Sequence, residues 1–369
     1  MTPRRRQKMP TFPISWPRLL LLGLLAAWHA PLPAAPAPVT EIRIAVPDLG
    51  AGSRPSGGGL VDVLREQQLF EQAFAGDGIH IAWTFFKGAG PAVNEALASG
   101  QVDFAFLGDL AAIIGKAGGL DTRLLCATAR GIKSYLGVVP GSGIKTLLDL
   151  KGRRVALFRG TANQLSFDAA LASQGLSERD IKVINLDFNA STAALAARQV
   201  DAVWGLSNLI ALRERGLAQI PLSSRDIQGA GSTQAVLVGA GAFVDQHPEL
   251  VVRLLRAHQQ AVRWLADEAN REAYLDLVSA TAGYPRVILE TDLEGERLGE
   301  MFAPQLDPPF LDHLQAGVEF ALAQRLIRKG FQVREWAAPR FLEAALDASL
   351  PGARPITDGA KAPPAQAAH

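Results

Sequence analysis

The chain contains 369 residues, of which 48% are hydrophobic and 20% are charged, and its formal net charge is +1 at pH 7. This composition excludes an intrinsically disordered chain, and the length allows two domains of ordinary size. Residues 1–37 hold basic side chains but no acidic ones, so the rest of the chain is slightly acidic. Because this remaining part of the chain has no excess of positive charge, it lacks the basic surface that nucleic-acid binding requires.

The N-terminal segment 1–37 has the pattern of a secretory signal peptide. Basic residues come first, followed by the apolar run 19–27 and then by small residues at 30–37. The run is too short to cross a bilayer comfortably, which favours cleavage over an uncleaved membrane anchor. We therefore expect an exported, periplasmic protein. At the other end, residues 351–369 are rich in Pro, Ala and Gly and are expected to be disordered.

After this signal the sequence alternates predicted strands and helices. Alternation and β-branching predict strands, and apolar residues at helical spacing predict helices, in the order strand 41–46, helix 60–70, strand 80–86, helix 92–98 and strand 102–107. A long loop rich in glycine, 48–59, follows the first strand. This order favours a parallel sheet with helices on its faces.

The same order returns further along the chain. The predicted elements are strand 154–158, helix 162–174, strand 182–186, a helix from Ser191 to Arg198 with Ser191 as its N-cap, and strand 200–204. A sequence duplication supports the repeat: residues 96–103 read ALASGQVD, and residues 194–201 read ALAARQVD. From about residue 246 onward the pattern is helical.

These patterns predict an α/β protein with two lobes, each a mixed, mostly parallel sheet flanked by helices. Segments 133–140 and 232–238 are expected to cross between the lobes and form a hinge. The predicted organisation is signal peptide 1–37, first part of lobe 1 at 38–131, lobe 2 at 132–236, return to lobe 1 with C-terminal helices at 237–350, and tail 351–369.

Loops that join a strand to a following helix are the candidate ligand site. In open α/β sheets ligands bind at the carboxyl ends of strands, where helix N-termini present free N–H groups suited to anions. We expect Thr161 and Asn163 to donate hydrogen bonds. The candidate residues are Asp48, Ser53, Arg54, Gly108, Asp109, Gly160, Thr161, Ala162, Asn163, Trp204 and Asn208.

Several of these residues have a structural alternative. Thr161 can simply cap its helix, Arg54 can be an ordinary surface arginine, and Trp204 can pack in the core. The matched acids Asp103 and Asp201 look like a catalytic pair, but a structural role at a strand entry is the better interpretation. Cys126, which lies in an apolar run, is expected to be a buried thiol.

No catalytic set stands out. The six histidines are scattered without metal-ligand spacing, and nucleophile or nucleotide-binding motifs are absent. We expect a protein that is not an enzyme, with no metal and no cofactor.

The chain resembles the substrate-binding proteins of ABC importers in the aliphatic sulfonate, taurine and nitrate group. The resemblance spans about residues 41–346 and is carried by 96–109, 140–156, 158–161 and 247–249. It implies a type II periplasmic-binding fold in which Asp48–Arg54, Gly108-Asp109 and Gly160–Asn163 line the site. Segment 205–208 departs from the Trp-Asp-Pro of sulfonate binders, which leaves the substrate open.

The expected function is capture of a small anion, with an aliphatic sulfonate first, and its delivery by a monomeric protein to an ABC permease in the inner membrane. Nitrate, taurine or a pyrimidine-type solute are alternatives on the same fold. Two other classes stay open: an enzyme built on the two-lobed scaffold, and a ligand-sensing module tethered to a receptor.

Overall fold

The computed structural model describes residues 38–227 and 230–347. The expected signal peptide, 1–37, and the expected tail, 351–369, lie outside these residues. In the described part no helix combines the length and the apolar character needed to cross a membrane.

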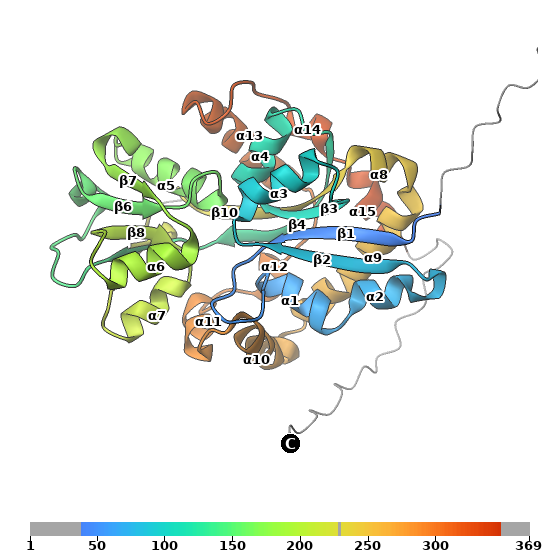
Figure 1. Ribbon diagram of the computed structural model, residues 1–369, viewed down its shortest axis with the longest axis horizontal. Coiled ribbons are helices and arrows are strands. Elements are labelled where there is room, and N and C mark those ends of the chain that lie inside the picture. Colours follow the sequence, from blue (N-terminus) through green and yellow to red (C-terminus); the bar gives the residue numbers. More distant parts are fainter. Residues whose placement is uncertain (1–37, 228–229, 348–369) are drawn as a thin grey trace, which may run out of the picture. The chain divides into compact units, whose positions relative to one another are not determined.

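The first sheet has the strand order β2-β1-β3-β10-β4 (Figure 1). Strand β1 pairs in parallel with β2 and β3, whereas β10 is antiparallel to both β3 and β4. The parallel pairs follow from the strand–helix–strand connections, which return the chain in the same direction. The strands are β1 (Glu41–Pro47), β2 (His80–Phe86), β3 (Phe104–Gly108), β4 (Thr122–Ile132) and β10 (Thr233–Ala240).

The second sheet repeats this plan with the order β7-β6-β8-β5-β9. Strand β6 is parallel to β7 and β8, and β5 is antiparallel to β8 and β9. In both sheets the first strand of the repeated unit lies between the second and the third. The strands are β5 (Tyr135–Val138), β6 (Arg154–Leu157), β7 (Lys182–Asn185), β8 (Ala202–Gly205) and β9 (Gln219–Ser223). The predicted fold class, two mixed sheets flanked by helices, is confirmed.

Helices cover both faces of the first sheet: α3 and α4 lie on one face, and α1 and α2 on the other (Figure 1). The helices that precede β5 or follow β9 in the chain are α1 (Gly59–Glu66), α2 (Leu69–Phe74), α3 (Ala89–Ala98), α4 (Asp109–Ala117), α8 (Gly241–Gln246), α9 (Pro248–Ala266), α10 (Arg271–Ala282), α11 (Arg286–Asp292), α12 (Leu298–Met301), α13 (Pro308–Ala323), α14 (Val333–Trp336) and α15 (Pro339–Leu346).

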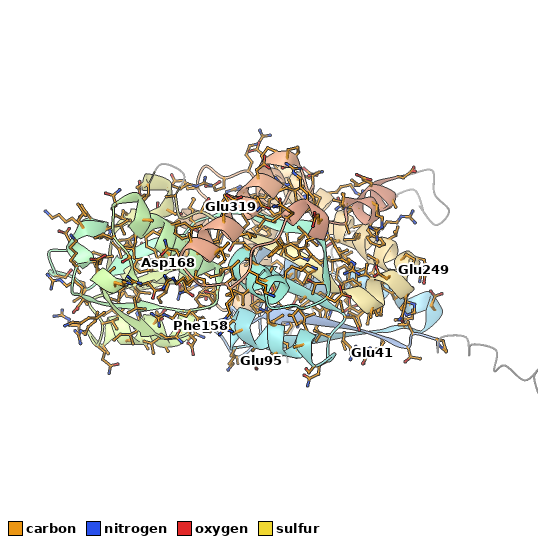
Figure 2. The ribbon with its side chains drawn as sticks, turned by 90° about the horizontal axis from the view of Figure 1, so that it is seen from above. Glu41, Glu95, Phe158, Asp168, Glu249 and Glu319 are labelled. Carbon is orange, nitrogen blue, oxygen red and sulfur yellow. The ribbon has the colours of Figure 1, made fainter. Side chains whose placement is uncertain are left out.

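The second sheet is flanked by α5 (Ala162–Ser173), α6 (Phe188–Ala196) and α7 (Asn208–Glu214). Figure 2 labels Asp168, which belongs to α5, and Phe158, which follows β6, in this second lobe. The prediction that Ser191 caps a helix is wrong. Helix α6 begins at Phe188 because Asp187 lies one position earlier and its Oδ1 accepts a hydrogen bond from Ala190 N at 2.7 Å.

The duplicated segments end in acids with matching structural contacts. Asp103 Oδ2 accepts hydrogen bonds from Arg43 N at 2.8 Å and from Arg43 Nε at 3.0 Å. Asp201 Oδ2 accepts from Arg154 N at 2.8 Å and from Arg154 Nε at 3.4 Å. Each acid thus fastens the start of the third strand of its lobe to the start of the first strand. These contacts support the structural interpretation of the two acids, because each acid binds an arginine of the first strand of its lobe.

Candidate functional site

A cavity of about 270 Å³ lies between the two lobes. Its wall combines residues that precede or begin helices of both lobes with residues of the C-terminal helices. The first lobe contributes the loop before α1 and the start of α4, and the second contributes the starts of α5 and α7. The cavity therefore lies at the carboxyl ends of parallel strands, which is where ligands bind in open α/β sheets.

Five of the candidate residues line the cavity. They come from the N-termini of α4, α5 and α7 and are Gly108, Thr161, Ala162, Asn163 and Asn208. The N-terminal turn of a helix presents N–H groups that have no partner within the helix. These residues stay candidates for contact with a ligand.

Two of these residues are buried amides with an atom that lacks a partner. Asn163 is 3% exposed, and its Nδ2 has no hydrogen-bond partner among the described residues. Asn208 is 8% exposed; its Nδ2 donates to Thr192 Oγ1 at 2.6 Å and to Phe188 O at 3.3 Å, while its Oδ1 lacks a partner there. An unpaired buried polar atom is unfavourable, so Asn163 gains from a ligand atom that accepts a hydrogen bond and Asn208 from one that donates.

Thr161 is the N-cap residue of α5, but its hydroxyl does not bond to the free N–H groups of that helix. Thr161 Oγ1 instead donates to Phe158 O at 2.6 Å. The structural alternative, a side-chain cap by Thr161, is therefore not realised, because the hydroxyl bonds to the preceding turn. Among the described residues no side chain caps the first turn of α5, whose residues Ala162 and Asn163 line the cavity, while Gln164 N donates to Thr161 O at 2.9 Å.

Asp109 does not line the cavity, and its carboxyl group bonds to backbone N–H groups of the first lobe. Its Oδ1 accepts from Leu110 N at 2.6 Å, and its Oδ2 accepts from Gln234 N at 2.9 Å. Burial raises the pKa of this carboxyl to about 7. Asp109 thereby ties the start of α4 to β10, the strand that brings the chain back from the second lobe.

Asp48 likewise organises its own loop. Asp48 Oδ1 accepts hydrogen bonds from Gly50 N at 3.0 Å and from Ser56 N at 3.2 Å. The next acid, Asp62, is fully buried and accepts from Ser56 Oγ at 2.6 Å and from Gly57 N at 3.1 Å. Burial raises the pKa of Asp62 to about 6. Two aspartates thus fold the glycine-rich loop so that its end, residues 56–59, faces the cavity.

The other candidates lie away from the cavity wall. Ser53 is exposed, and Arg54 points outward to pair with Glu66 at 3.1 Å. Trp204 is 1% exposed because its ring packs 5.7 Å from that of Phe167, and its Nε1 donates to Ser166 Oγ at 2.9 Å.

Gly160 also lies outside the lining but contacts the first lobe. A Cβ on Gly160 would lie 2.9 Å from Pro91 Cγ, and its backbone has a φ of +74°. Its N–H donates to Gln164 Oε1 at 2.8 Å, which holds the loop in place. Glycine is thus required here both by the left-handed backbone and by the neighbouring lobe.

The C-terminal helices supply lining that the sequence did not reveal. Residues of α10, α11 and α12 and the loops beside them form an apolar wall. Ile288 of α11 is fully buried in a cluster that contains Leu209 and Ile210 of the second lobe. A hydrogen bond also joins the lobes here, because Tyr135 Oη donates to Asp292 Oδ1 at 2.6 Å. The unpredicted lining residues of this wall are Tyr274, Val278, Ala282, Tyr284, Leu289, Asp292, Leu293, Met301 and Phe302.

Charge at the cavity is internally balanced. Lys133 and Asp292 are the charged side chains among its described lining residues. Lys133 Nζ donates to Asp292 O and pairs with Glu296 at 3.2 Å. Burial raises the pKa of Asp292. The structure therefore offers an anion helix N-termini and the Asn163 amide rather than an unpaired cation.

The described residues contain no grouped metal ligands, and the Cys126 thiol is buried. Across residues 38–227 and 230–347, no three or more His, Cys, Asp and Glu side chains are grouped to hold a metal ion. Cys126 is fully buried in β4, and burial raises the pKa of its thiol. The expectation of a buried thiol is thus confirmed, and Cys126 does not line the cavity.

Together these features define a two-lobed α/β protein with a cavity between its lobes. The chain belongs to the NMT1/THI5-like family, whose model matches residues 74–271, more than half of the sequence.

Known relatives and solved structures agree with this class. A candidate aliphatic sulfonates-binding protein of Bacillus subtilis is 27% identical over 77% of this chain and 84% of the relative. The structure of a candidate periplasmic sulfonate-binding protein, SsuA, from Methylobacillus flagellatus is 28% identical, with a TM-score of 0.72 over 84% of this chain and 94% of that chain. A 2'-hydroxybiphenyl-2-sulfinate desulfinase of Rhodococcus erythropolis is 28% identical over 42% of this chain and 41% of the relative. The predicted resemblance to sulfonate-binding proteins is confirmed.

Proposed function

We propose that this chain is an exported, monomeric solute-binding protein of an ABC importer, which captures a small anionic solute between its lobes and delivers it to a membrane permease. An aliphatic sulfonate is the first candidate ligand. The observation that carries the proposal is the interlobe cavity at which the starts of α4 and α5 meet. The relatives named for sulfonate binding support the choice of anion.

The proposed binding mode uses the polar side of the cavity. The anionic head lies against the uncapped start of α5 and against Gly108, where N–H groups and helix dipoles stabilise negative charge. Asn163 donates through the Nδ2 atom that has no partner among the residues the structure describes. Binding closes the lobes about the two crossings that follow β4 and precede β10, and the permease recognises the closed form.

A ligand panel tests this proposal. Thermal and chemical unfolding of the purified protein are measured with aliphatic sulfonates, taurine, nitrate and a pyrimidine. A ligand at 100 times its dissociation constant stabilises the folded state by about 2.7 kcal/mol. We expect stabilisation by sulfonates. Stabilisation by uncharged compounds alone would contradict the anion assignment, and no stabilisation by any of these solutes would contradict the proposed class of ligand.

An enzyme on the same scaffold is the alternative, favoured by the partial match to the desulfinase. Cys126 is poorly placed to act as a thiol nucleophile, because it is fully buried and does not line the cavity. Incubation with 2'-hydroxybiphenyl-2-sulfinate separates the two functions. Turnover that releases sulfite would support an enzyme, whereas binding without turnover supports solute capture.

A further inference from the structure

The cavity has a second, apolar side, which we call the apolar compartment. We define it by six lining residues that come from α1 and from the C-terminal part of the chain: Leu60, Tyr274, Val278, Leu289, Leu293 and Phe302. We propose that this compartment holds an aromatic ring, so that the ligand is an arenesulfonate or a related aryl anion rather than a short alkanesulfonate. This inference rests on the proposed function and specifies the hydrocarbon group that is attached to the anionic head of the ligand.

Contacts around Gly59 build one wall of the compartment. A Cβ on Gly59 would lie 2.9 Å from Phe302 Cζ and 3.3 Å from Tyr274 Oη. The rings of Tyr274 and Phe302 meet edge to face, with centroids 6.0 Å apart and planes at 66°. Both side chains are at most 4% exposed, so they are held by packing. Such a fixed pair of rings is a wall suited to stacking or edge contact with another ring.

Several polar groups beside the compartment bond within the protein. Tyr284 Oη donates to Leu49 O at 2.7 Å, and Ser56 Oγ donates to Asp62 Oδ2 at 2.6 Å. Lys133 is engaged by Asp292 O and by Glu296. The accessible lining of the cavity is accordingly mainly apolar. A hydrated inorganic anion would leave this carbon surface without a partner, whereas an aromatic body covers it.

The size of the cavity agrees with a ring plus a head group. An apolar cavity of about 150 Å³ accommodates benzene. The present cavity measures about 270 Å³ and also reaches the polar starts of α4 and α5. An arenesulfonate can therefore place its ring against the C-terminal helices and its sulfonate against the helix N-termini. A methane- or ethanesulfonate fills only the polar side.

Calorimetry with ligands that share a sulfonate group but differ in the size of their hydrocarbon part tests the inference. The purified protein is titrated with methanesulfonate, ethanesulfonate, benzenesulfonate and naphthalenesulfonate, and with benzyl alcohol as a ring without the anion. We expect affinity to rise at least tenfold from methanesulfonate to an arenesulfonate, with a more negative heat-capacity change. Equal affinity across the series would overturn the inference and leave the proposed function intact. No binding of any sulfonate would overturn both the inference and the sulfonate as the proposed ligand.

A pair of substitutions in α10 locates the ring. Ala282 lies one helical turn after Val278 of the compartment and also lines the cavity, whereas Ala280 of the same helix is exposed. We expect Ala282→Leu to weaken arenesulfonate binding at least tenfold and methanesulfonate binding less than twofold, and Ala280→Leu to change neither. If Ala282→Leu weakens both ligands equally, the ring does not lie in the compartment. Should that variant fail to fold, the wild-type series decides the inference by itself.

Discussion

Gly108 of the first lobe faces Ala162 of the second so closely that a Cβ on Gly108 would lie 2.7 Å from the Cβ of Ala162. Gly108 has an ordinary backbone, with φ −70° and ψ 157°. Glycine is therefore required here by the approach of the lobes and not by the conformation of the chain. The contact joins the end of β3 to the start of α5, beside the proposed anion site.

Gly108→Ala is expected to hinder the approach of the lobes without straining the backbone. We expect ligand affinity to fall about tenfold, which corresponds to about 1.4 kcal/mol, with little change in melting temperature. Calorimetry measures the affinity, and small-angle scattering measures the radius of gyration with and without ligand. Gly76→Ala is the control, because a Cβ at Gly76 meets nothing within 4 Å. Unchanged affinity in Gly108→Ala would show that the lobe contact is irrelevant to binding.

Asn163→Ala is expected to separate binding from stability. Because Asn163 Nδ2 has no partner among the described residues, its removal breaks no recorded bond of that atom. We expect a loss of at least tenfold in affinity for the anion, with a change in unfolding free energy under about 1 kcal/mol. Titration calorimetry and urea unfolding provide the two numbers. Gln174→Ala, at the exposed end of the same helix, is the control; a stability loss without an affinity loss would make Asn163 purely structural.

Tyr135→Phe is expected to loosen the link between the second lobe and α11. The Tyr135 hydroxyl donates to the buried Asp292 carboxyl. Its removal leaves that group short of a donor, and we expect a loss of about 1.5–3 kcal/mol in unfolding free energy. Tyr284→Phe loses a bond to a neutral carbonyl, Leu49 O, and is expected to cost about 0.5–1.5 kcal/mol. Equal losses of unfolding free energy in the two variants, measured by urea unfolding, would show that the bond to Asp292 stabilises the protein no more than the bond to Leu49 O does.

Asp168 gives the second lobe a specific pH dependence. Burial, and then the neighbouring Glu178, raise the pKa of Asp168 from 3.8 to about 8. An acid with a higher pKa in the folded chain keeps its proton on folding, so its contribution to the unfolding free energy falls as pH rises from about 4 to about 8. Asp168→Asn is expected to reduce this decline and to stabilise the protein at pH 8 by about 1–2 kcal/mol.

Urea unfolding at several pH values between 4 and 8 measures that slope. The exposed Asp312, which pairs with Arg334 at 2.7 Å, supplies the control variant Asp312→Asn. This control is expected to keep the wild-type slope. A wild-type slope in Asp168→Asn would contradict a protonated Asp168 in the folded protein.

The local elements of the fold were predictable from the sequence because they depend on short-range patterns. Helix α5 was expected at 162–174 and lies at Ala162–Ser173. The duplicated segments were expected to lead into third strands, and β3 and β8 follow them. The start of α6 was missed because two good caps, Asp187 and Ser191, lie within one helical turn, and pattern alone did not rank them.

Some of the candidate residues lie at the cavity and others do not, and the difference has one cause. Several loops after strands reach the cavity, where Thr161, Ala162 and Asn163 line it. Which side chains of a loop face inward depends on contacts made elsewhere. Asp48 bonds within its own loop, Arg54 turns outward to Glu66, and Trp204 bonds to Ser166.

The sequence by itself determined the repeated strand–helix plan and the helix starts that can bind an anion, because periodicity and capping act over a few residues. Only the tertiary structure decided that α10, α11 and α12 complete the cavity. Val278 and Phe302 lie far along the chain from Gly59 and Asn163, yet all four line the same space. Packing between distant segments brings them together, and no local pattern encodes which distant surface a helix will meet.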